Sequence, residues 1–351
     1  MTEIPFTGDG YVDLPELIRQ APPFLWVCGG RGIGKTFGAF DDVRYLNPRK
    51  FLLMRRTQQQ MDLVKKQMFN PFHPNDQFHE DLTAVKSEGK MALFYRGNME
   101  DSQIRPAGPV LGYGAALSTI HNVRGVDLSD VVTWIYDEFV PEKHERPIKC
   151  EWEAFLNAAE TIGRNRELQG RPPLQFVGLT NSNSLGNPYF IGMGIMRQVD
   201  KMIRERRPIW EDKNRGIMVV ILPDKTSPIS EAKKSTSLYR MAGWDSAFGR
   251  MSLGNEFVDD HCTNQGSRPL RELRPLAFVG EIAFYEHKHT REIFCNDHRS
   301  GTAASYQPSD YDLTRARRDL WYLVEAYLQR EIYFLDVFCE VMFKKYFKIS
   351  T

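Results

Sequence analysis

Short apolar runs, each ending at glycine or polar residues, alternate along the chain with segments whose apolar residues recur at helical spacing. Runs of this length predict buried strands, and a spacing of three and four residues predicts amphipathic helices. The predicted core strands are Phe24–Cys28, Phe51–Met54, Val110–Leu117, Val131–Phe139, Leu174–Leu179 and Gly216–Leu222. Strands that alternate with helices, such as the one predicted over Glu151–Ile162, are typical of an α/β fold with a mainly parallel sheet.

The pattern changes at about residue 267. Two antiparallel strands are predicted over Leu276–Tyr285 and Arg291–Cys295, and helical spacing continues from about Ser309 to the end. The apolar residues expected to face inward there are Trp321, Val324, Leu328 and Ile332. We therefore expect a first domain over residues 1–225, a linker or lid over 226–266 and a small α+β domain over 267–351.

Composition narrows the class of protein. The 351 residues are 42% hydrophobic and 26% charged, which is ordinary for a globular protein with one large or two smaller domains. A net charge of +1 gives no overall electrostatic case for nucleic acid, so any basic surface has to be local. Five cysteines without C-x-x-C spacing argue against a zinc site or a disulfide framework. No apolar run approaches the ~20 residues that span a bilayer, and the N-terminus lacks a secretory signal, so we expect a cytoplasmic protein with no membrane partner.

The first predicted strand runs directly into a glycine-rich stretch, GGRGIGKT, over residues 29–36. This stretch matches the phosphate-binding loop G-x-x-x-x-G-K-[ST], and the flanking strand and helix patterns are the context that the motif needs. The expected nucleotide-binding residues are Gly29, Gly30, Arg31, Gly32, Ile33, Gly34, Lys35 and Thr36. Backbone N–H groups converge on the phosphates, Lys35 should reach the β- and γ-phosphate oxygens, and the Thr36 hydroxyl should coordinate Mg²⁺.

A pair of acids, Asp137 and Glu138, lies near the end of the apolar run Val131–Phe139, about a hundred residues after the loop. Asp137 is expected to hold the Mg²⁺ ion, usually through water, and Glu138 to act as general base for the attacking water. Consecutive acids favour an ATPase of the additional-strand, catalytic-glutamate (ASCE) class, and the Asn-Lys-x-Asp guanine signature is absent after the next strand. ATP and Mg²⁺ are therefore the predicted cofactors.

Polar residues at other strand and helix ends are weaker candidates. Arg164 follows a predicted helix, where it could supply positive charge to a γ-phosphate or simply lie on the surface. Thr180 and Asn181 follow a core strand and could sense the γ-phosphate, position water or form a turn. Arg55 and Arg56 end another strand and could face nucleotide, a neighbouring subunit or DNA, or be solvated.

Four motifs in this order, GGRGIGKT, IYDEF, GRNRE and TNSNSLGNPYF, resemble the DNA-packaging ATPases of phi-29-type podophages. The resemblance covers about residues 24 to 260, and the remainder is similar mainly in length and in its order of strands and helices. It implies an ATP-driven double-stranded DNA translocase in a homopentameric ring. The ring would dock through a prohead RNA onto the portal at the capsid vertex, in the host cytoplasm.

Site residues follow from the resemblance by position. Lys35 and Thr36 would bind phosphate and Mg²⁺, Asp137 would be the Walker B residue, Glu138 the catalytic glutamate, and Arg164 the finger on the neighbour's ATP, with Arg166 as second choice.

The C-terminal domain of the family resembles an RNase H-like nuclease that has lost its metal-binding acids. Here the strand predicted over Leu276–Tyr285 carries Glu281 but no aspartate at a convincing position. That composition favours a domain that binds nucleic acid over one that cuts it.

Two other functions stay open at this stage. A terminase-like motor with an active, metal-dependent nuclease would need clustered acids, for which Asp297, Asp310 and Asp312 are candidates. A non-motor nucleotide switch would use the loop only to gate the binding of a partner, and Glu138 argues against it because a switch needs no poised base.

Overall fold

The chain forms two compact units, Met1–Val258 and Asp259–Thr351. The computed structural model describes residues 3–65, 83–100, 103–123, 125–141, 145–181, 184–222, 228–246, 249 and 262–349. Of the segment predicted as a linker or lid, residues 226–227, 247–248 and 250–261 lie outside the described residues. Its residues 228–246 and 249 belong to the first unit, and 262–266 belong to the second. Among the described helices none is long and apolar enough to cross a membrane.

The first unit is built on a mainly parallel sheet with the strand order β3-β4-β5-β2-β6-β7-β1-β9-β8. Its parallel centre consists of β1 (Phe24–Cys28), β2 (Phe51–Arg55), β6 (Thr133–Asp137), β7 (Gln175–Thr180) and β9 (Ile217–Ile221). Antiparallel pairing joins β3 (Thr83–Glu88), β4 (Met91–Glu100) and β5 (Gln103–Ala116) at one edge of the sheet. At the other edge β8 (Ile209–Asp212) pairs antiparallel with β9. The predicted α/β fold and its core strands are confirmed.

The strand order separates the strand that precedes the phosphate loop from the strand that carries the acids. β7 pairs with β1 on one side and with β6 on the other, both in parallel. An inserted strand at this position is what the additional-strand class predicts. The carboxyl ends of β1, β6 and β7 therefore meet at one edge of the sheet, where open α/β sheets bind ligands.

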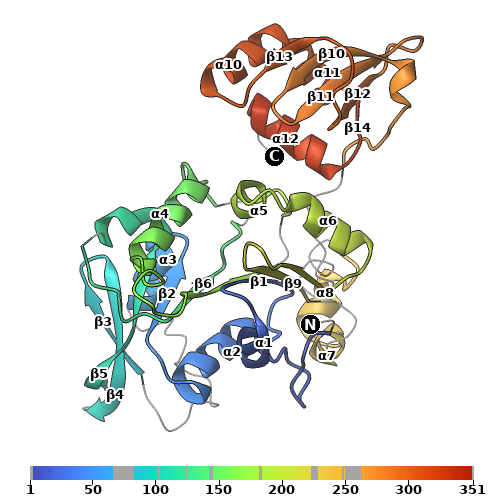
Figure 1. Ribbon diagram of the computed structural model, residues 1–351. Helices are drawn as coiled ribbons and strands as arrows, with labels where there is room; N and C mark the ends of the chain where they lie inside the picture. The colour runs from blue at the N-terminus through green and yellow to red at the C-terminus, as the bar shows by residue number, and fades with distance from the viewer. Residues whose placement is uncertain are drawn as a thin grey trace. The chain divides into compact units, whose positions relative to one another are not determined.

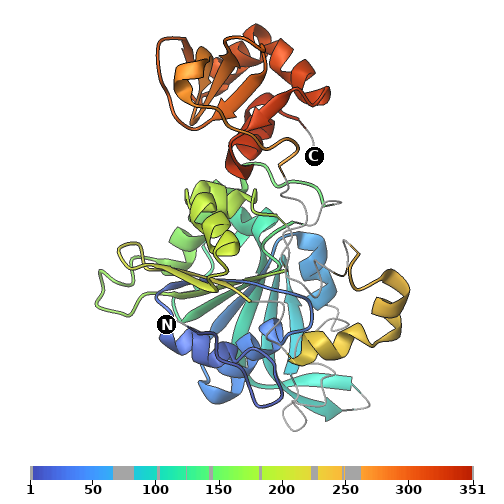
Figure 2. The same cartoon turned by 90° about the vertical axis from the view of Figure 1, so that its right-hand side faces the viewer.

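Helices cover both faces of this sheet, as Figures 1 and 2 show. One face carries α1 (Leu14–Gln20) and α2 (Lys35–Asp41), which continues as a π-helical turn over Asp42–Leu46; the other carries α4 (Glu151–Gly163), α5 (Pro188–Gly192) and α6 (Met196–Arg204). The other helices that the described residues of the unit form are α3 (Gln58–Lys65), the 3-10 segment η3 (Leu117–Val123), α7 (Pro228–Lys234) and α8 (Ser237–Ala242).

Successive side chains of β1 point to opposite faces of the sheet, and each face has its own hydrophobic core. Leu25 and Val27 belong to the aliphatic core with α1 and α2, whereas the ring of Trp26 packs among aromatic rings on the other face. The centroids of its partner rings lie 4.6 to 5.5 Å away in Phe139, Phe155, Phe176 and Tyr189. Aromatic pairs contribute roughly 0.5–1.5 kcal/mol each beyond the area that they bury, so this cluster fixes α4 and α5 firmly on the sheet.

Two helices, α5 and α6, occupy the segment between Asn187 and Arg206. Gly194, with a φ of 68°, adopts the left-handed conformation between α5 and α6 and ends the first helix. The edge strand β8 was not predicted, since only one face of an edge strand is buried and its residues Ile209–Asp212 are half polar.

The second unit contains a sheet of order β13-β10-β11-β12-β14. Its strands are β10 (Leu273–Val279), β11 (Ile282–His287), β12 (Ile293–Asn296), β13 (Ala304–Tyr306) and β14 (Ile332–Phe334), and its helices are η4 (Leu270–Glu272), α10 (Asp310–Asp319), α11 (Trp321–Leu328) and α12 (Val337–Phe347). The small α+β architecture agrees with the prediction.

The single strand predicted over Leu276–Tyr285 is wrong. The chain reverses at Gly280-Glu281, and β10 and β11 pair antiparallel on either side of this turn. Gly280 has a φ of 52°, and a Cβ there would lie 2.3 Å from the Tyr346 hydroxyl, so both the backbone and the space require glycine. Glu281 consequently lies in a turn and not on a strand.

The inward face predicted for the last helices is also wrong in part. Trp321 is 60% exposed and Leu328 is 71% exposed, whereas Leu323 and Ala326 are buried. Ile332 is buried as predicted, but it lies in the short strand β14. The prediction treated the segment as one continuous helical pattern, whereas α11 ends at Leu328 and the strand β14 follows it.

Candidate nucleotide-binding site

The glycine-rich loop connects β1 to α2 through two residues in the left-handed conformation. Gly32 has a φ of 67° and Gly34 a φ of 92°, and Gly34 is the N-cap of α2. The positive φ of Gly34 favours glycine, and a Cβ there would also lie close to the Tyr11 side chain, at 3.2 Å. The loop is anchored to the sheet because the Gly29 N–H donates to the Thr180 carbonyl oxygen over 3.1 Å.

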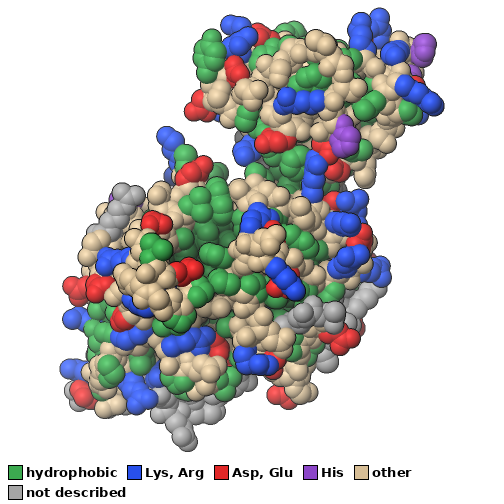
Figure 3. Space-filling model, in the orientation of Figure 1, with side chains coloured by type: hydrophobic (Ala, Val, Ile, Leu, Met, Phe, Trp, Pro, Cys, Tyr) green, Lys and Arg blue, Asp and Glu red, His purple; other side chains and the backbone are tan. Residues whose placement is uncertain are grey.

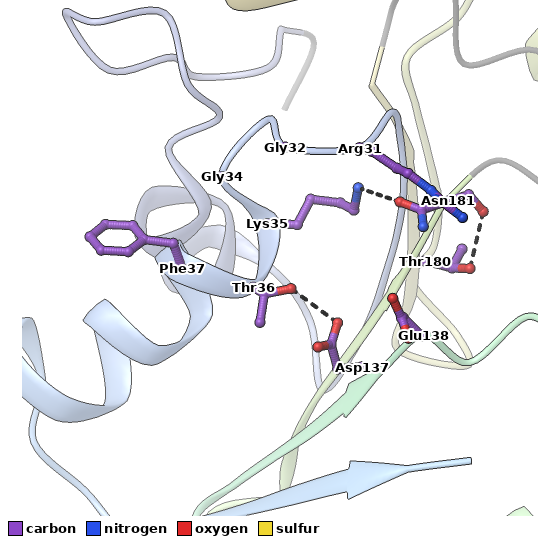
Figure 4. Close-up of a pocket in the computed structure, with 10 residues that line it drawn as sticks. All are labelled: Arg31, Gly32, Gly34, Lys35, Thr36, Phe37, Asp137, Glu138, Thr180 and Asn181. Carbon is purple, nitrogen blue, oxygen red and sulfur yellow. Dashed lines mark hydrogen bonds between the residues drawn. The ribbon is translucent and has the colours of Figure 1, made fainter. Parts of the chain in front are cut away.

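Lys35 projects into the pocket from the first position of α2 (Figure 4). Its Nζ donates to the carbonyl oxygens of Gly29 and Gly30, over 2.8 and 2.6 Å, and approaches Asn181 Oδ1 at 3.4 Å. Burial of the ammonium group lowers the pKa of Lys35 to about 8, although the nearby Asp137 carboxylate opposes the shift. The loop therefore holds a buried ammonium group that two carbonyl oxygens and the nearby Asp137 carboxylate stabilise only in part.

Thr36 and Asp137 meet across the pocket. The Thr36 hydroxyl donates to Asp137 Oδ1 over 3.1 Å, and Asp137 is the last residue of β6. A hydroxyl and a carboxylate are hard oxygen ligands of the kind that Mg²⁺ takes beside a phosphate, so this donor set fits the predicted ion.

Glu138 follows β6 with a φ of 59°, a left-handed conformation that is uncommon outside glycine. Its side chain is 51% exposed and lines the same pocket. Arg55, the last residue of β2, contacts both acids: Nη1 lies 2.9 Å from Glu138 Oε2, and Nη2 lies 3.2 Å from Asp137 Oδ2. The sequence left the surroundings of Arg55 open, and in the structure this side chain lies beside the two acids of the pocket.

The pocket formed by these residues has a volume of about 410 Å³. It is lined by Arg31, Gly32, Gly34, Lys35, Thr36, Phe37, Asp137, Glu138, Thr180 and Asn181. Of the predicted loop residues, Gly29 and Gly30 contribute the carbonyl oxygens that bind Lys35, and Ile33 packs into the core. Phe37 lines the pocket without having been predicted. Residues 182 and 183, which follow Asn181 in the motif, lie outside the described residues.

Arg56 is directed away from the pocket and is completely buried. Its guanidinium forms a bidentate pair with Glu151, with Nε 2.7 Å from Oε1 and Nη2 2.9 Å from Oε2. Neighbouring arginines at the end of β2 thus have different environments, which the sequence does not distinguish.

Arg164 and Arg166 lie near the amino-terminal ends of the parallel strands, whereas the pocket lies at their carboxyl ends. Arg164 caps the end of α4, donating from Nη2 to the Val126 carbonyl oxygen and pairing through Nη1 with Asp127 at 3.3 Å. Arg166 is only 6% exposed and donates from Nη1 to the Val131 carbonyl oxygen over 2.7 Å. These partners precede β6, whereas the pocket lies after it. Five strand residues span about 13 Å, so neither arginine reaches the pocket of its own chain.

The three acids considered for a nuclease do not form a cluster. Asp310 and Asp312 lie in the first turn of α10, Asp312 pairs with Arg315 at 3.3 Å, and Asp297 lies beside His298. Within the described ranges no group of three His, Cys, Asp or Glu side chains is arranged to hold a metal ion.

A parallel α/β sheet with a glycine loop, a buried lysine and a Thr–Asp pair at the same edge defines a P-loop nucleotide-binding protein. Comparison with known families then specifies which one. The family model described as Podovirus DNA encapsidation protein (Gp16) matches residues 11–279, and the chain belongs to this family.

Individual relatives are DNA packaging proteins of Bacillus phages. The proteins of phages phi29 and PZA are each 27% identical over 239 residues, which cover 67% of this chain and 62% of theirs. The protein of phage B103 has the same identity, with 64% of its length covered. The matched region thus spans less than two thirds of these relatives.

Two solved structures share the fold along nearly the whole chain. "The bacteriophage Phi-29 viral genome packaging motor assembly" gives a TM-score of 0.68 at 15% identity, over 97% of this chain and 99% of that one. "The Phi-28 gp11 DNA packaging Motor" gives 0.63 at 17% identity, over 98% and 100%. At these identities the comparison establishes the fold of both units.

Proposed function

We propose that this protein is an ATP-driven double-stranded DNA translocase that packages a viral genome into a preformed capsid. The observation that carries the proposal is the convergence of Lys35, Thr36, Asp137 and Glu138 on one pocket, in a chain that belongs to an encapsidation family. DNA packaging is also the activity named for the relatives in phages phi29, PZA and B103.

Each side chain has a defined part in ATP hydrolysis. Lys35 would bind the β- and γ-phosphate oxygens, and Thr36 and Asp137 would hold Mg²⁺, which would neutralise charge on the phosphates. Glu138 orients and deprotonates the attacking water. Asn181, already within reach of Lys35, and Thr180 are placed to sense the γ-phosphate.

Arg164 acts on the nucleotide of the neighbouring subunit. It lies at the edge of the sheet opposite to its own pocket, so only a head-to-tail arrangement brings it to a phosphate. Contacts of that heterologous type form a ring where the rotation between subunits closes, and from the family resemblance we propose a homopentamer. Arg166, the second choice, is less suited because its guanidinium is buried within its own subunit.

The remaining partners are proposals from family resemblance: double-stranded DNA, a prohead RNA and the portal vertex, reached in the host cytoplasm. We also propose that the second unit is a nucleic-acid-binding domain with an RNase H-like ancestry and no nuclease activity. On the face in Figure 3, Lys and Arg side chains are interspersed with Asp and Glu, so the basic groups on this face are local and could contact DNA phosphates singly.

A packaging assay tests the proposed function. Proheads, genomic DNA, the protein and ATP should yield DNA protected from added nuclease, and a non-hydrolysable ATP analogue should yield none. Protection without hydrolysis would contradict a motor, and divalent-metal-dependent cleavage of plasmid DNA by the protein would favour the nuclease alternative.

The affinity for ATP should fall as the pH rises above 8. Burial lowers the pKa of Lys35 to about 8, so in the free protein the ammonium group is present below this pH and is lost above it. Bound phosphates stabilise the charged form, so above pH 8 binding of ATP has to be accompanied by uptake of a proton. The dissociation constant of a fluorescent ATP analogue should rise by up to about tenfold per pH unit above pH 8. Lys35→Arg, which stays protonated, is the control, and an equally flat profile for the wild type would contradict the assignment.

Replacing Arg55 by alanine should lower turnover while leaving nucleotide affinity nearly unchanged. Arg55 holds the Glu138 carboxylate, and misplacement of a catalytic group by about 1 Å costs on the order of 10²-fold. Arg49→Ala is the matched control, since Arg49 also ends in an ion pair, with Asp42, but lies away from the pocket. Equal turnover in both variants would show that Arg55 does not position Glu138.

A further inference from the structure

A buried polar network lies behind the nucleotide pocket and takes no part in the chemistry described above. Glu151, the first residue of α4, is 4% exposed, and Arg56 is completely buried. Besides its bidentate pair with Glu151, Arg56 lies 3.2 Å from Glu145 Oε2 and donates to the Arg146 carbonyl oxygen over 3.1 Å. Each of the three nitrogens of this guanidinium thus donates to at least one named acceptor.

A second branch reaches the same carboxylate from β6. The hydroxyls of Tyr136 and Tyr189 lie 2.7 Å apart, and the Tyr189 hydroxyl donates to Glu151 Oε1 over 3.0 Å. Both rings are fully buried in the aromatic cluster between α4, α5 and the sheet. Glu151 therefore ties together β2, β6 and α5 at the start of α4.

The two branches end at the immediate neighbours of the pocket residues. Arg56 follows Arg55, and Tyr136 precedes Asp137. Tyr136 and Asp137 are successive residues of β6, and successive side chains of a strand point to opposite faces, so the network holds β6 from the face opposite to Asp137. Arg56 directly follows the last residue of β2, Arg55. β2 and β6 are paired in this region, with Met54 opposite Tyr136.

We propose that Glu151 is a positioning residue for ATP hydrolysis, acting through Arg56 and Tyr136 to set the positions of Asp137 and of Arg55, which holds the catalytic Glu138. This inference rests on the proposed function, since it assigns a further residue to that reaction. A buried ion pair gains little stability over well-packed apolar side chains, whereas it imposes a directional geometry. Four fixed donor–acceptor distances, 2.7, 2.9, 3.0 and 2.7 Å, supply that geometry here.

Two variants and one double-mutant cycle test the proposal by steady-state hydrolysis and by binding of a fluorescent ATP analogue. Glu151→Gln should lower kcat roughly 10- to 100-fold with nucleotide affinity unchanged. Tyr189→Phe removes only the hydroxyl that joins Tyr136 to Glu151 and should lower kcat by a smaller factor. In an Arg55→Ala background Glu151→Gln should have little further effect, because both changes act on Glu138.

Glu340→Gln is the matched control for loss of a buried carboxylate. Glu340 is 2% exposed, lies in the second unit, and accepts hydrogen bonds from Thr263 and Tyr327. It should lower the unfolding temperature while leaving basal kcat at the wild-type value. If Glu151→Gln fails to fold, Tyr189→Phe decides alone.

The outcomes separate the inference from the function on which it rests. A wild-type protein that does not hydrolyse ATP contradicts the proposed function. Additive effects of Glu151→Gln and Arg55→Ala, or a wild-type kcat in both Glu151→Gln and Tyr189→Phe, overturn the positioning role while leaving that function intact.

Discussion

Glu138→Gln should abolish steady-state ATP hydrolysis while ATP binding persists. The amide has nearly the shape of the carboxylate, but it cannot accept the proton of the attacking water. Loss of a general base costs typically 10²- to 10⁴-fold, so turnover should fall by about that factor. The phosphate contacts of Lys35 and the Mg²⁺ ligands Thr36 and Asp137 are untouched, and the affinity for an ATP analogue should stay within about threefold of the wild type, or 0.7 kcal/mol.

Glu88→Gln is a suitable control for this variant, since Glu88 lies on the edge strand β3 and is exposed. Hydrolysis and binding should both match the wild type. If Glu138→Gln hydrolyses ATP at the wild-type rate, Glu138 is not the base and the exposed carboxylate beside Arg55 has another role.

Arg164→Ala should nearly abolish turnover in the assembled ring. Arginine fingers contribute about 10³- to 10⁵-fold to phosphoryl transfer, and this arginine faces the opposite edge of the sheet from its own pocket. Binding of ATP by the isolated subunit should be unchanged, because no residue of the pocket is altered. Arg215→Ala, at an exposed arginine that pairs with Asp212, is the control.

Mixed rings distinguish action on the neighbour from action within one chain. Subunits with Arg164→Ala keep an intact pocket, and subunits with Glu138→Gln keep an intact finger. When the two inactive variants are mixed, interfaces that combine the intact pocket and the intact finger should recover turnover. No recovery at any mixing ratio, with ring assembly confirmed, would contradict action in trans.

The phosphate loop could be predicted from sequence because its geometry is encoded by consecutive residues. Glycines at positions 32 and 34 adopt the left-handed backbone, and a strand and a helix flank them in the order that the pattern indicates. The Asp137-Glu138 pair was also recognisable, because an apolar run precedes it at a suitable distance from the loop.

The role of Arg55 could not be derived in the same way. Its contact with Glu138 joins residues far apart in the chain and exists because β2 pairs with β6. The burial of Arg56 likewise depends on Glu151 and Tyr189, which no local pattern connects to it. Pairing between distant strands therefore determines the parts of the site that sequence left open.

Turns inside apolar runs were the other source of error. Gly280 lies between two strands that read as one continuous apolar segment, and the short strand β14 interrupts an apparently helical period. In both places the chain changes direction within two or three residues, which is less than one turn of a helix.

The measurement that tests the central claim most directly is ATP hydrolysis with and without double-stranded DNA, over a range of protein concentrations, with Glu138→Gln as the blank. A ring whose sites are completed by Arg164 of the neighbour should show turnover per subunit that rises steeply with concentration and is increased by DNA. Turnover that is independent of both, in preparations that form rings, would contradict a DNA-translocating motor with shared sites.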